Sequence, residues 1–150
     1  MATRFAGRSA GFTREGTQLD AYCSALGKVL LAYLPAADRD AYLAGGPFPK
    51  LTSRTIQDAK ALASHLRKVR RQSYAVDDGE FAEELKCIAV PVRNPGRRVC
   101  AALSITTTPG KLRGTRAAQV LDVLRRAAAD IEAGLSIGAK PPPRSRRPGR

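Results

Sequence analysis

Two adjacent β-strand candidates joined by a short turn place the strongest constraint on what this chain can fold into. Apolar and small residues alternate along residues 85–93 and again along residues 98–108. Between them, Asn94-Pro95-Gly96-Arg97 contains the Pro and Gly that are typical of a turn. A symmetric hairpin pairs Arg93 with Arg98 and predicts these partners further along: Ala89 with Ala102, Cys87 with Ser104, and Leu85 with Thr106.

Side chains alternate between the two faces of a strand, so the hairpin has two different faces. One face is apolar and is expected in the core: Ile88, Val90, Val92, Val99, Leu103 and Ile105. The other carries small residues, hydroxyls and a thiol: Leu85, Cys87, Ala89, Ala102, Ser104 and Thr106. Such a face is able to form the floor of a pocket for a small polar ligand. The simpler interpretation is a second helix-covered face with local Ser and Thr hydrogen bonds.

The rest of the chain predicts helices around this hairpin. The expected elements are a short strand at 9–14, a helix capped by Ser24 and closed by Pro35, a helix at 38–44, a helix capped by Asp58, a strand at 73–77 and a long amphipathic helix at 115–135. This order predicts an α+β domain in which helices pack on an antiparallel sheet.

Two of these helices have apolar stripes. In the helix after Asp58 the stripe is Leu62, Ala63, Leu66 and Val69, and the remaining faces are basic. His65, the only histidine, is expected on that exposed basic surface, without a catalytic role. In the last helix the residues expected to face inward are Val120, Leu121, Leu124, Ala127, Ala128 and Ile131.

The composition narrows the possible functions. At 150 residues the chain is one domain at most, and Trp is absent, which disfavours a stacking platform for nucleic-acid bases. The net charge is +13, but residues 140–150 hold five of the cations and no acid. This Pro- and Arg-rich tail is expected to be disordered, and it either contacts DNA weakly and non-specifically or only keeps the chain soluble.

Targeting and redox signals favour the cytoplasm. No apolar run is long enough for a transmembrane helix, so no membrane partner is expected. Three widely spaced cysteines fit reduced thiols in a cytosol and form neither a disulfide framework nor a zinc motif.

Three local features are consistent with one kind of ligand, a small anion. The helix after Ser24 begins with the free amides of Ala25, Leu26 and Gly27, which favour an anion, although every helix has such an end. Asp77 ends a strand before an acidic turn, where a ligand hydroxyl or the turn's own amides are its possible partners. The third feature is the hydroxyl and thiol face of the hairpin.

Catalysis and metal binding are not expected. Cys or Ser nucleophiles need a base, and the histidine lies elsewhere in the chain. The acids Asp77, Asp78 and Glu80 are too few to complete a cation site, and a solvated turn explains them better. We therefore expect a binding protein without a metal or cofactor.

Five segments carry a resemblance to a known family. They are GTQLDAYCSALGKVLLA (16–32), LTSRTI (51–56), RRQSYAVDD (70–78), LKCIAVPVR (85–93) and AALSI (101–105). In this order and spacing they resemble the effector-binding domain of IclR-type transcriptional regulators. The resemblance implies a GAF-like α/β domain that binds small organic acids and forms dimers or tetramers. It also implies effector contacts from the amides of Ala25 and Leu26 and from five side chains: Asp77, Leu85, Cys87, Ser104 and Thr106.

The chain also departs from the family pattern. The winged helix-turn-helix and the opening strands of the effector domain are missing, so a truncated or split regulator, or a misplaced gene start, is expected. DNA would then be bound only through a helix-turn-helix outside this chain, or weakly through the tail. Residues 1–8 are expected to be disordered, 9–138 to form the partial effector domain and 139–150 to form the disordered tail. Ser73 replaces a Gly at a helix end, where a left-handed backbone is expected.

Three functions stay open at this point. The first is an effector sensor for a small carboxylate, working through oligomer rearrangement in the cytoplasm. The second is a stand-alone interaction module that forms a heterodimer with an intact paralogous regulator without binding a ligand. The third, a basic DNA-compacting protein, rests on charge alone.

Overall fold

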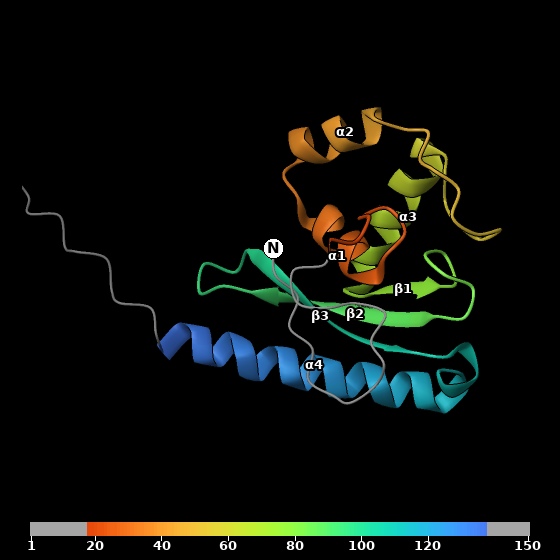
Figure 1. Cartoon of the computed structure of the whole chain (residues 1–150). Helices are drawn as coiled ribbons and strands as arrows, with labels where there is room; N and C mark the ends of the chain where they lie inside the picture. The colour runs from red at the N-terminus through yellow and green to blue at the C-terminus, as the bar shows by residue number, and fades with distance from the viewer. Residues whose placement is uncertain (1–17, 138–150) are drawn as a thin grey trace, which may run out of the picture.

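The computed structural model describes residues 18–137, and these form helices on both faces of one antiparallel sheet (Figure 1). The elements are α1 (Ala25–Tyr33), α2 (Ala36–Ala44), α3 (Ala59–Gln72), β1 (Ala75–Asp78), β2 (Lys86–Arg93), β3 (Val99–Thr107), a 3-10 turn η1 (Pro109–Lys111) and α4 (Gly114–Ile137). The predicted order of three helices, three strands and a final helix is confirmed. The strand expected at 9–14 and the expected disorder at 1–8 and 139–150 lie outside the described residues.

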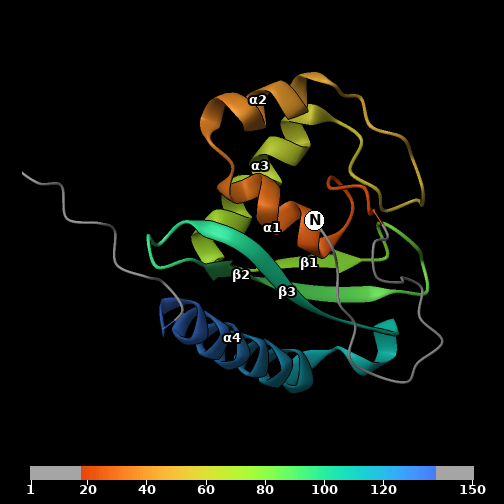
Figure 2. The ribbon, with the colours of Figure 1, turned by 60° about the vertical axis from the view of Figure 1, so that its left-hand side comes forward.

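The sheet has the order β1-β2-β3 and separates two cores. Helix α4 covers one face, while α1 lies on the other face with α3 and α2 beyond it (Figure 2). The α4 core consists of Ile88, Val90, Val92, Leu112, Leu124 and Ala128. The α1 core is larger and includes Cys23, Val29, Leu62, Leu66, Val69, Ala75 and Ala89. The sheet is therefore covered on both sides, and its central strand β2 contributes to both cores.

The register of the hairpin differs from the symmetric prediction by two residues. Cys87 pairs with Thr106 and Ala89 with Ser104, so the predicted pairs Leu85–Thr106, Cys87–Ser104 and Ala89–Ala102 are wrong. One residue of the shift arises in the loop, where Arg97 adopts a left-handed backbone with φ 62° and Arg93 pairs with Val99.

A β-bulge supplies the second residue of the shift. Val92 pairs with Ala101, so the bulge lies at Cys100. A shift of two residues keeps most side chains on the predicted face, since the side-chain period is two. Val99 lies beyond the bulge and belongs to neither core, contrary to expectation.

Two predicted helix caps are present. The Ser24 hydroxyl accepts a hydrogen bond from the Gly27 amide at 3.1 Å, and the Asp58 carboxylate accepts one from the Ala61 amide at 2.7 Å. Helix α3 ends at Ser73, which is left-handed with φ 59° and ψ 34°. The backbone conformation that glycine would adopt freely is thus retained by a serine.

Helix α4 extends past the sheet that it covers. A 24-residue helix is about 36 Å long, whereas the eight residues of β2 span about 26 Å. Leu124 and Ala128 are buried on the sheet, but Ile131 is 43% exposed, so the prediction that Ile131 faces inward is wrong. The exposed apolar residues of α4 are Val123, Ile131, Leu135 and Ile137.

Gly27 lets α1 pack tightly against the turn that precedes it. A Cβ at this position would lie 2.3 Å from the Ala21 Cα and 2.5 Å from the Ala21 carbonyl oxygen. Gly134 on α4 has no neighbour within 4 Å of its Cβ position. The two helical glycines therefore have opposite constraints.

We expect Gly27→Ala to destabilise the fold by about 2 kcal/mol or more, because the backbone of Ala21 has to move. Gly134→Ala, the matched control, should stabilise it by up to about 1 kcal/mol through helix propensity. Urea unfolding followed by circular dichroism measures both. A neutral Gly27→Ala variant would contradict the close approach.

Candidate functional site

The register places three of the predicted site residues in one row across the sheet. Asp77 pairs with Cys87, and Cys87 pairs with Thr106. The Cys87 sulfur and the Thr106 hydroxyl oxygen are 3.2 Å apart, within hydrogen-bond distance. Ser104 lies one row away, opposite Ala89. Thr106 is exposed, so the β3 end of this row is open to solvent, whereas Asp77 at the β1 end is buried.

Helix α1 covers the neighbouring part of the same face, with Val29 and Ala32 in one core with Ala75 and Ala89. The middle of this face is therefore covered by a helix, as the simpler of the two interpretations predicted. The row of Asp77, Cys87 and Thr106 lies beside it, where Leu26 and Cys87 pack at the border of this core. Leu85, just before β2, is buried.

The start of α1 keeps two free backbone donors. The Ser24 hydroxyl donates to the Asp20 carbonyl at 3.0 Å and accepts a hydrogen bond from the Gly27 amide. The expectation that the Gly27 amide is a free donor is therefore wrong. The amides of Ala25 and Leu26 have no acceptor among residues 18–137. These two amides and the helix dipole favour a negative charge at this point.

Asp77 is almost completely buried and is not a solvated turn residue. Its Oδ1 accepts hydrogen bonds from the Glu80 amide at 2.7 Å and from the Phe81 amide at 3.4 Å. Burial raises the pKa of this carboxyl, and the two amide donors oppose the rise. One oxygen of Asp77 is thus committed to holding its own turn.

A buried lysine is the main feature that the sequence analysis missed. Lys28 has no exposed surface, and its Nζ donates to the Val76 carbonyl at 2.7 Å and forms an ion pair with the Glu80 carboxylate. Burial raises the pKa of Glu80, and the Lys28 ammonium opposes that rise. The sequence signal was a lysine on the same helix face as Ala25, Val29 and Ala32.

The segment around Thr52 and Thr55 supports the acidic turn from the other side. The Thr52 hydroxyl donates to the Gly79 carbonyl at 2.6 Å, and the Thr55 hydroxyl donates to the Glu80 carbonyl at 2.8 Å. The remaining acid, Asp78, pairs with Lys86 at 3.0 Å and Arg54 at 3.8 Å. The three acids are thus held by cations and amides, and within residues 18–137 no set of three or more metal-ligating side chains is placed to hold a metal.

Two cysteines near the row are protonated thiols at neutral pH. Burial raises the pKa of Cys87 to about 11 and that of Cys23 to about 12. A protonated thiol is a poor nucleophile, but it is still able to donate a weak hydrogen bond. Cys87 therefore contributes polarity to the site rather than reactivity.

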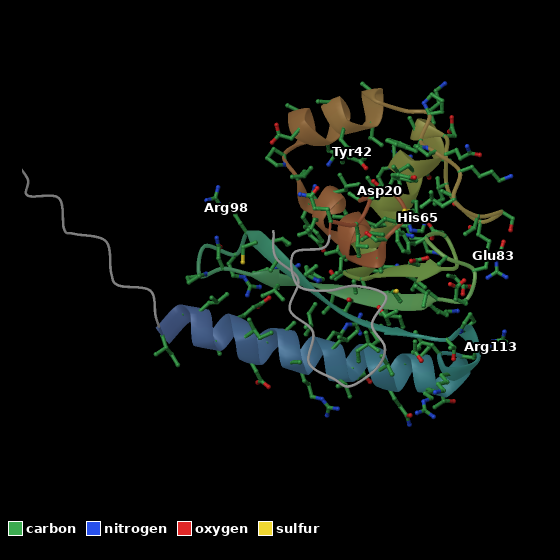
Figure 3. The ribbon with its side chains drawn as sticks, in the orientation of Figure 1. Asp20, Tyr42, His65, Glu83, Arg98 and Arg113 are labelled. Atoms are coloured by element: carbon green, nitrogen blue, oxygen red, sulfur yellow. The ribbon has the colours of Figure 1, made fainter. Side chains whose placement is uncertain are left out.

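His65 is half-buried on α3, so its expected place on the exposed surface is wrong (Figure 3). Its Nε2 is buried without a hydrogen-bond partner among the described residues. Burial, assisted by the charges of Lys28 and Lys68, lowers the pKa of His65 to about 4. The ring is neutral at physiological pH.

This arrangement of helices on a three-stranded antiparallel sheet is that of the C-terminal domain of a class of bacterial transcriptional regulators. The family model "Bacterial transcriptional regulator IclR C-terminal" matches residues 8–133. The chain therefore belongs to the IclR family, whose members are regulators and not enzymes, and corresponds to its C-terminal domain.

Individual relatives agree with this assignment. The chain is 34% identical to the transcriptional regulator XynR of Escherichia coli over 128 residues, which are 85% of this chain and 51% of XynR. The C-terminal domain of the E. coli regulator KdgR superposes with a TM-score of 0.73 at 35% identity, over 81% of this chain and 73% of that domain. The inducer-binding domain of a double mutant of PobR from Acinetobacter, in complex with 3-hydroxy benzoic acid, superposes with a TM-score of 0.77 at 27% identity, over 85% of this chain and 75% of that one.

The chain spans about half the length of XynR, and less of several other curated relatives. None of the helices in residues 18–137 has the length and apolar character needed to cross a membrane. The activity of a whole regulator is therefore treated below as a proposal.

We expect Lys28→Met to destabilise the domain by about 3 kcal/mol or more, because Glu80 is left buried without its partner. Lys86→Met removes the partly exposed pair with Asp78 and should cost less than about 1 kcal/mol. The double variant Lys28→Met with Glu80→Leu should recover much of the loss. Urea unfolding measures all three, and similar losses for Lys28→Met and Lys86→Met would contradict the importance of the buried pair.

We expect His65 to make stability depend on pH. Its pKa is lower in the folded than in the unfolded chain, so its contribution is complete above about pH 6.5 and is lost as the pH falls to about 4. Because the ring is only half-buried, the loss should be on the order of 1–2 kcal/mol. The difference in unfolding free energy between wild type and His65→Gln should change over this range and stay constant between pH 7 and 8. A constant difference throughout would contradict the low pKa.

Proposed function

We propose that this domain is the effector-sensing part of an IclR-family regulator and that the effector is a small carboxylate. The observation that carries the proposal is the pair of α1 amides, Ala25 and Leu26, without acceptors, beside a row of polar side chains. The effector-binding set comprises Ala25, Leu26, Asp77, Leu85, Cys87, Ser104 and Thr106.

The polar members have the following chemical roles in this proposal, while Leu85 is a buried apolar residue. The two amides receive the carboxylate, because the start of a helix favours an anion. The hydroxyls of Ser104 and Thr106 and the Cys87 thiol face the body of the ligand as neutral donors. Asp77, which has one oxygen committed to its turn, accepts a hydrogen bond from a hydroxyl or other neutral group of the ligand. The complex of a PobR double mutant with a hydroxylated aromatic acid supports this class of ligand.

In the whole regulator, we infer, binding changes the arrangement of subunits in a cytoplasmic dimer or tetramer and so changes operator affinity. Two surfaces support self-association. Strand β3 has no neighbour on its outer edge among the described residues, and the end of α4 exposes Ile131, Leu135 and Ile137. In this proposal, DNA binding belongs to a part of the regulator outside residues 18–137.

The same open edge of β3 supports a second candidate function. A domain of this kind can pair with an intact paralogous regulator and modulate it without a ligand. Hetero-complex formation that is indifferent to every carboxylate would favour this candidate over the sensor.

The test is a thermal-unfolding scan of the purified chain against keto, hydroxy and aromatic carboxylates, followed by calorimetric titration of the best compound. We expect one class to raise the unfolding midpoint. Ser104→Ala should weaken binding by about fivefold to tenfold, since one hydrogen bond is lost. Thr107→Ala is the matched control, because it removes a hydroxyl from the opposite face of β3.

A second variant tests the helix amides directly. Ala25→Pro removes one donor at the first helical position, where proline is tolerated, and Ser24 already has the extended backbone that precedes a proline (ψ 145°). Circular dichroism should show that the helix content of this variant is unchanged, while its affinity for the carboxylate should fall at least tenfold. Full affinity in both Ala25→Pro and Ser104→Ala would overturn the site.

A further inference from the structure

A cavity of about 160 Å³ lies at the opposite end of β2 from the polar row. It is open to solvent and lies between the end of α3, the end of β2 and the C-terminal half of α4. Its polar lining consists of Ser73, Arg93, Arg125 and Glu132, and its apolar lining includes Val90 and Ala128. Arg93 lies six positions after Cys87 on β2, about 20 Å away, so the two places are distinct.

Two arginines flank this cavity from opposite faces of the sheet, at the part of β2 beyond its pairing with β1, and their guanidinium groups have only weak partners. Arg93 lies over the Tyr33 ring at 5.5 Å, and its Nη2 is 3.5 Å from the Tyr33 hydroxyl oxygen. Arg125 lies over the Tyr74 ring at 5.9 Å, with its nearest carboxylate, Asp122, at 3.9 Å. Within residues 18–137, Arg93 forms no side-chain ion pair. Both groups keep donors for an anion.

The one carboxylate in the lining limits the charge that the cavity accepts. Glu132 Oε1 accepts a hydrogen bond from the Arg93 backbone amide at 2.8 Å, so its position is fixed. Arg70 lies over the same Tyr33 ring at 5.8 Å, and Asp122 lies beside Arg125, so three arginines and two carboxylates leave a single positive charge in excess. This balance favours a monoanion over a dianion such as phosphate, and the Val90 and Ala128 wall favours an apolar body.

The backbone strain at Ser73 is a second, independent indication that the cavity is a functional site. Ser73 is a non-glycine residue in the left-handed region, with φ 59°, and such strain is concentrated at functional sites. Ser73 is part of the cavity lining, and its hydroxyl accepts a hydrogen bond from the Tyr33 hydroxyl at 3.3 Å. A glycine would relieve the strain but would remove the hydroxyl.

We propose that this cavity is a second binding site, for a small monocarboxylate with an apolar body. Arg93 and Arg125 receive the carboxylate, the Ser73 hydroxyl donates to it, and the apolar wall contacts the body of the ligand. The site is independent of the proposed effector site at the start of α1.

The experiment uses benzoate as the probe and follows backbone and arginine side-chain resonances of the isotope-labelled full chain by NMR. Benzoate should shift the signals of Ser73, Arg93 and Arg125, whatever happens at Ala25 and Leu26. Failure of the effector proposal and failure of this one are therefore seen at different residues. Inorganic phosphate should bind more weakly than benzoate.

Variants identify the groups that bind. Arg93→Gln and Arg125→Gln should each raise the dissociation constant for benzoate about tenfold or more. Arg126→Gln, the matched control next to Arg125 on an exposed face of α4, should leave it unchanged. Ser73→Gly should raise the midpoint of thermal unfolding and still weaken the binding of benzoate, so the effect on binding is separated from the effect on folding.

Three results would overturn the proposal. The first is the absence of benzoate-induced shifts around Ser73, Arg93 and Arg125. The second is an affinity for benzoate that Arg93→Gln, Arg125→Gln and Ser73→Gly leave unchanged. The third is tighter binding of phosphate than of benzoate.

Discussion

The buried ion pair between Lys28 and Glu80 is the interaction on which the rest of the domain depends. It ties the middle of α1 to the turn after β1, and the same ammonium binds the Val76 carbonyl within β1. Thr52 and Thr55 hold the carbonyls of that turn, and Asp77 holds its amides. A buried charge without its partner is strongly destabilising, so the helix, the strand and the turn have to form together. The start of α1 is thereby fixed relative to the polar row of the sheet.

Local signals predicted the elements well. Ser24 and Asp58 were identified as caps from residue type alone, because capping depends on a side chain and amides only a few positions away. The hairpin strands and their two faces followed from alternation. The exact pairing did not, because it depends on a left-handed Arg97 and a bulge at Cys100, and neither residue type signals these.

Features set by distant contacts were not predictable in the same way. Lys28 reads as an ordinary surface lysine until Glu80, 52 positions later, is placed beside it. His65 has cations on both sides in sequence, yet α1 packs near enough for burial and Lys28 to act on its pKa. Ile131 continues the apolar stripe of α4 but is 43% exposed, although the next residue, Glu132, still reaches Arg93 at the end of β2. In each case the missing information was where another element lies.

The two candidate binding places are built from different groups, and this determines how each responds to its surroundings. The start of α1 offers neutral backbone donors on a buried scaffold, next to thiol and hydroxyl groups with no net charge. The cavity at the far end of β2 depends on guanidinium groups that are partly exposed; the Arg125 side chain is 49% exposed. Interactions of exposed charges are screened by salt, whereas those of buried donors are screened much less. Binding at the cavity should therefore weaken with ionic strength more steeply than binding at α1, so carboxylate titrations at two salt concentrations separate the two sites even in the wild-type chain.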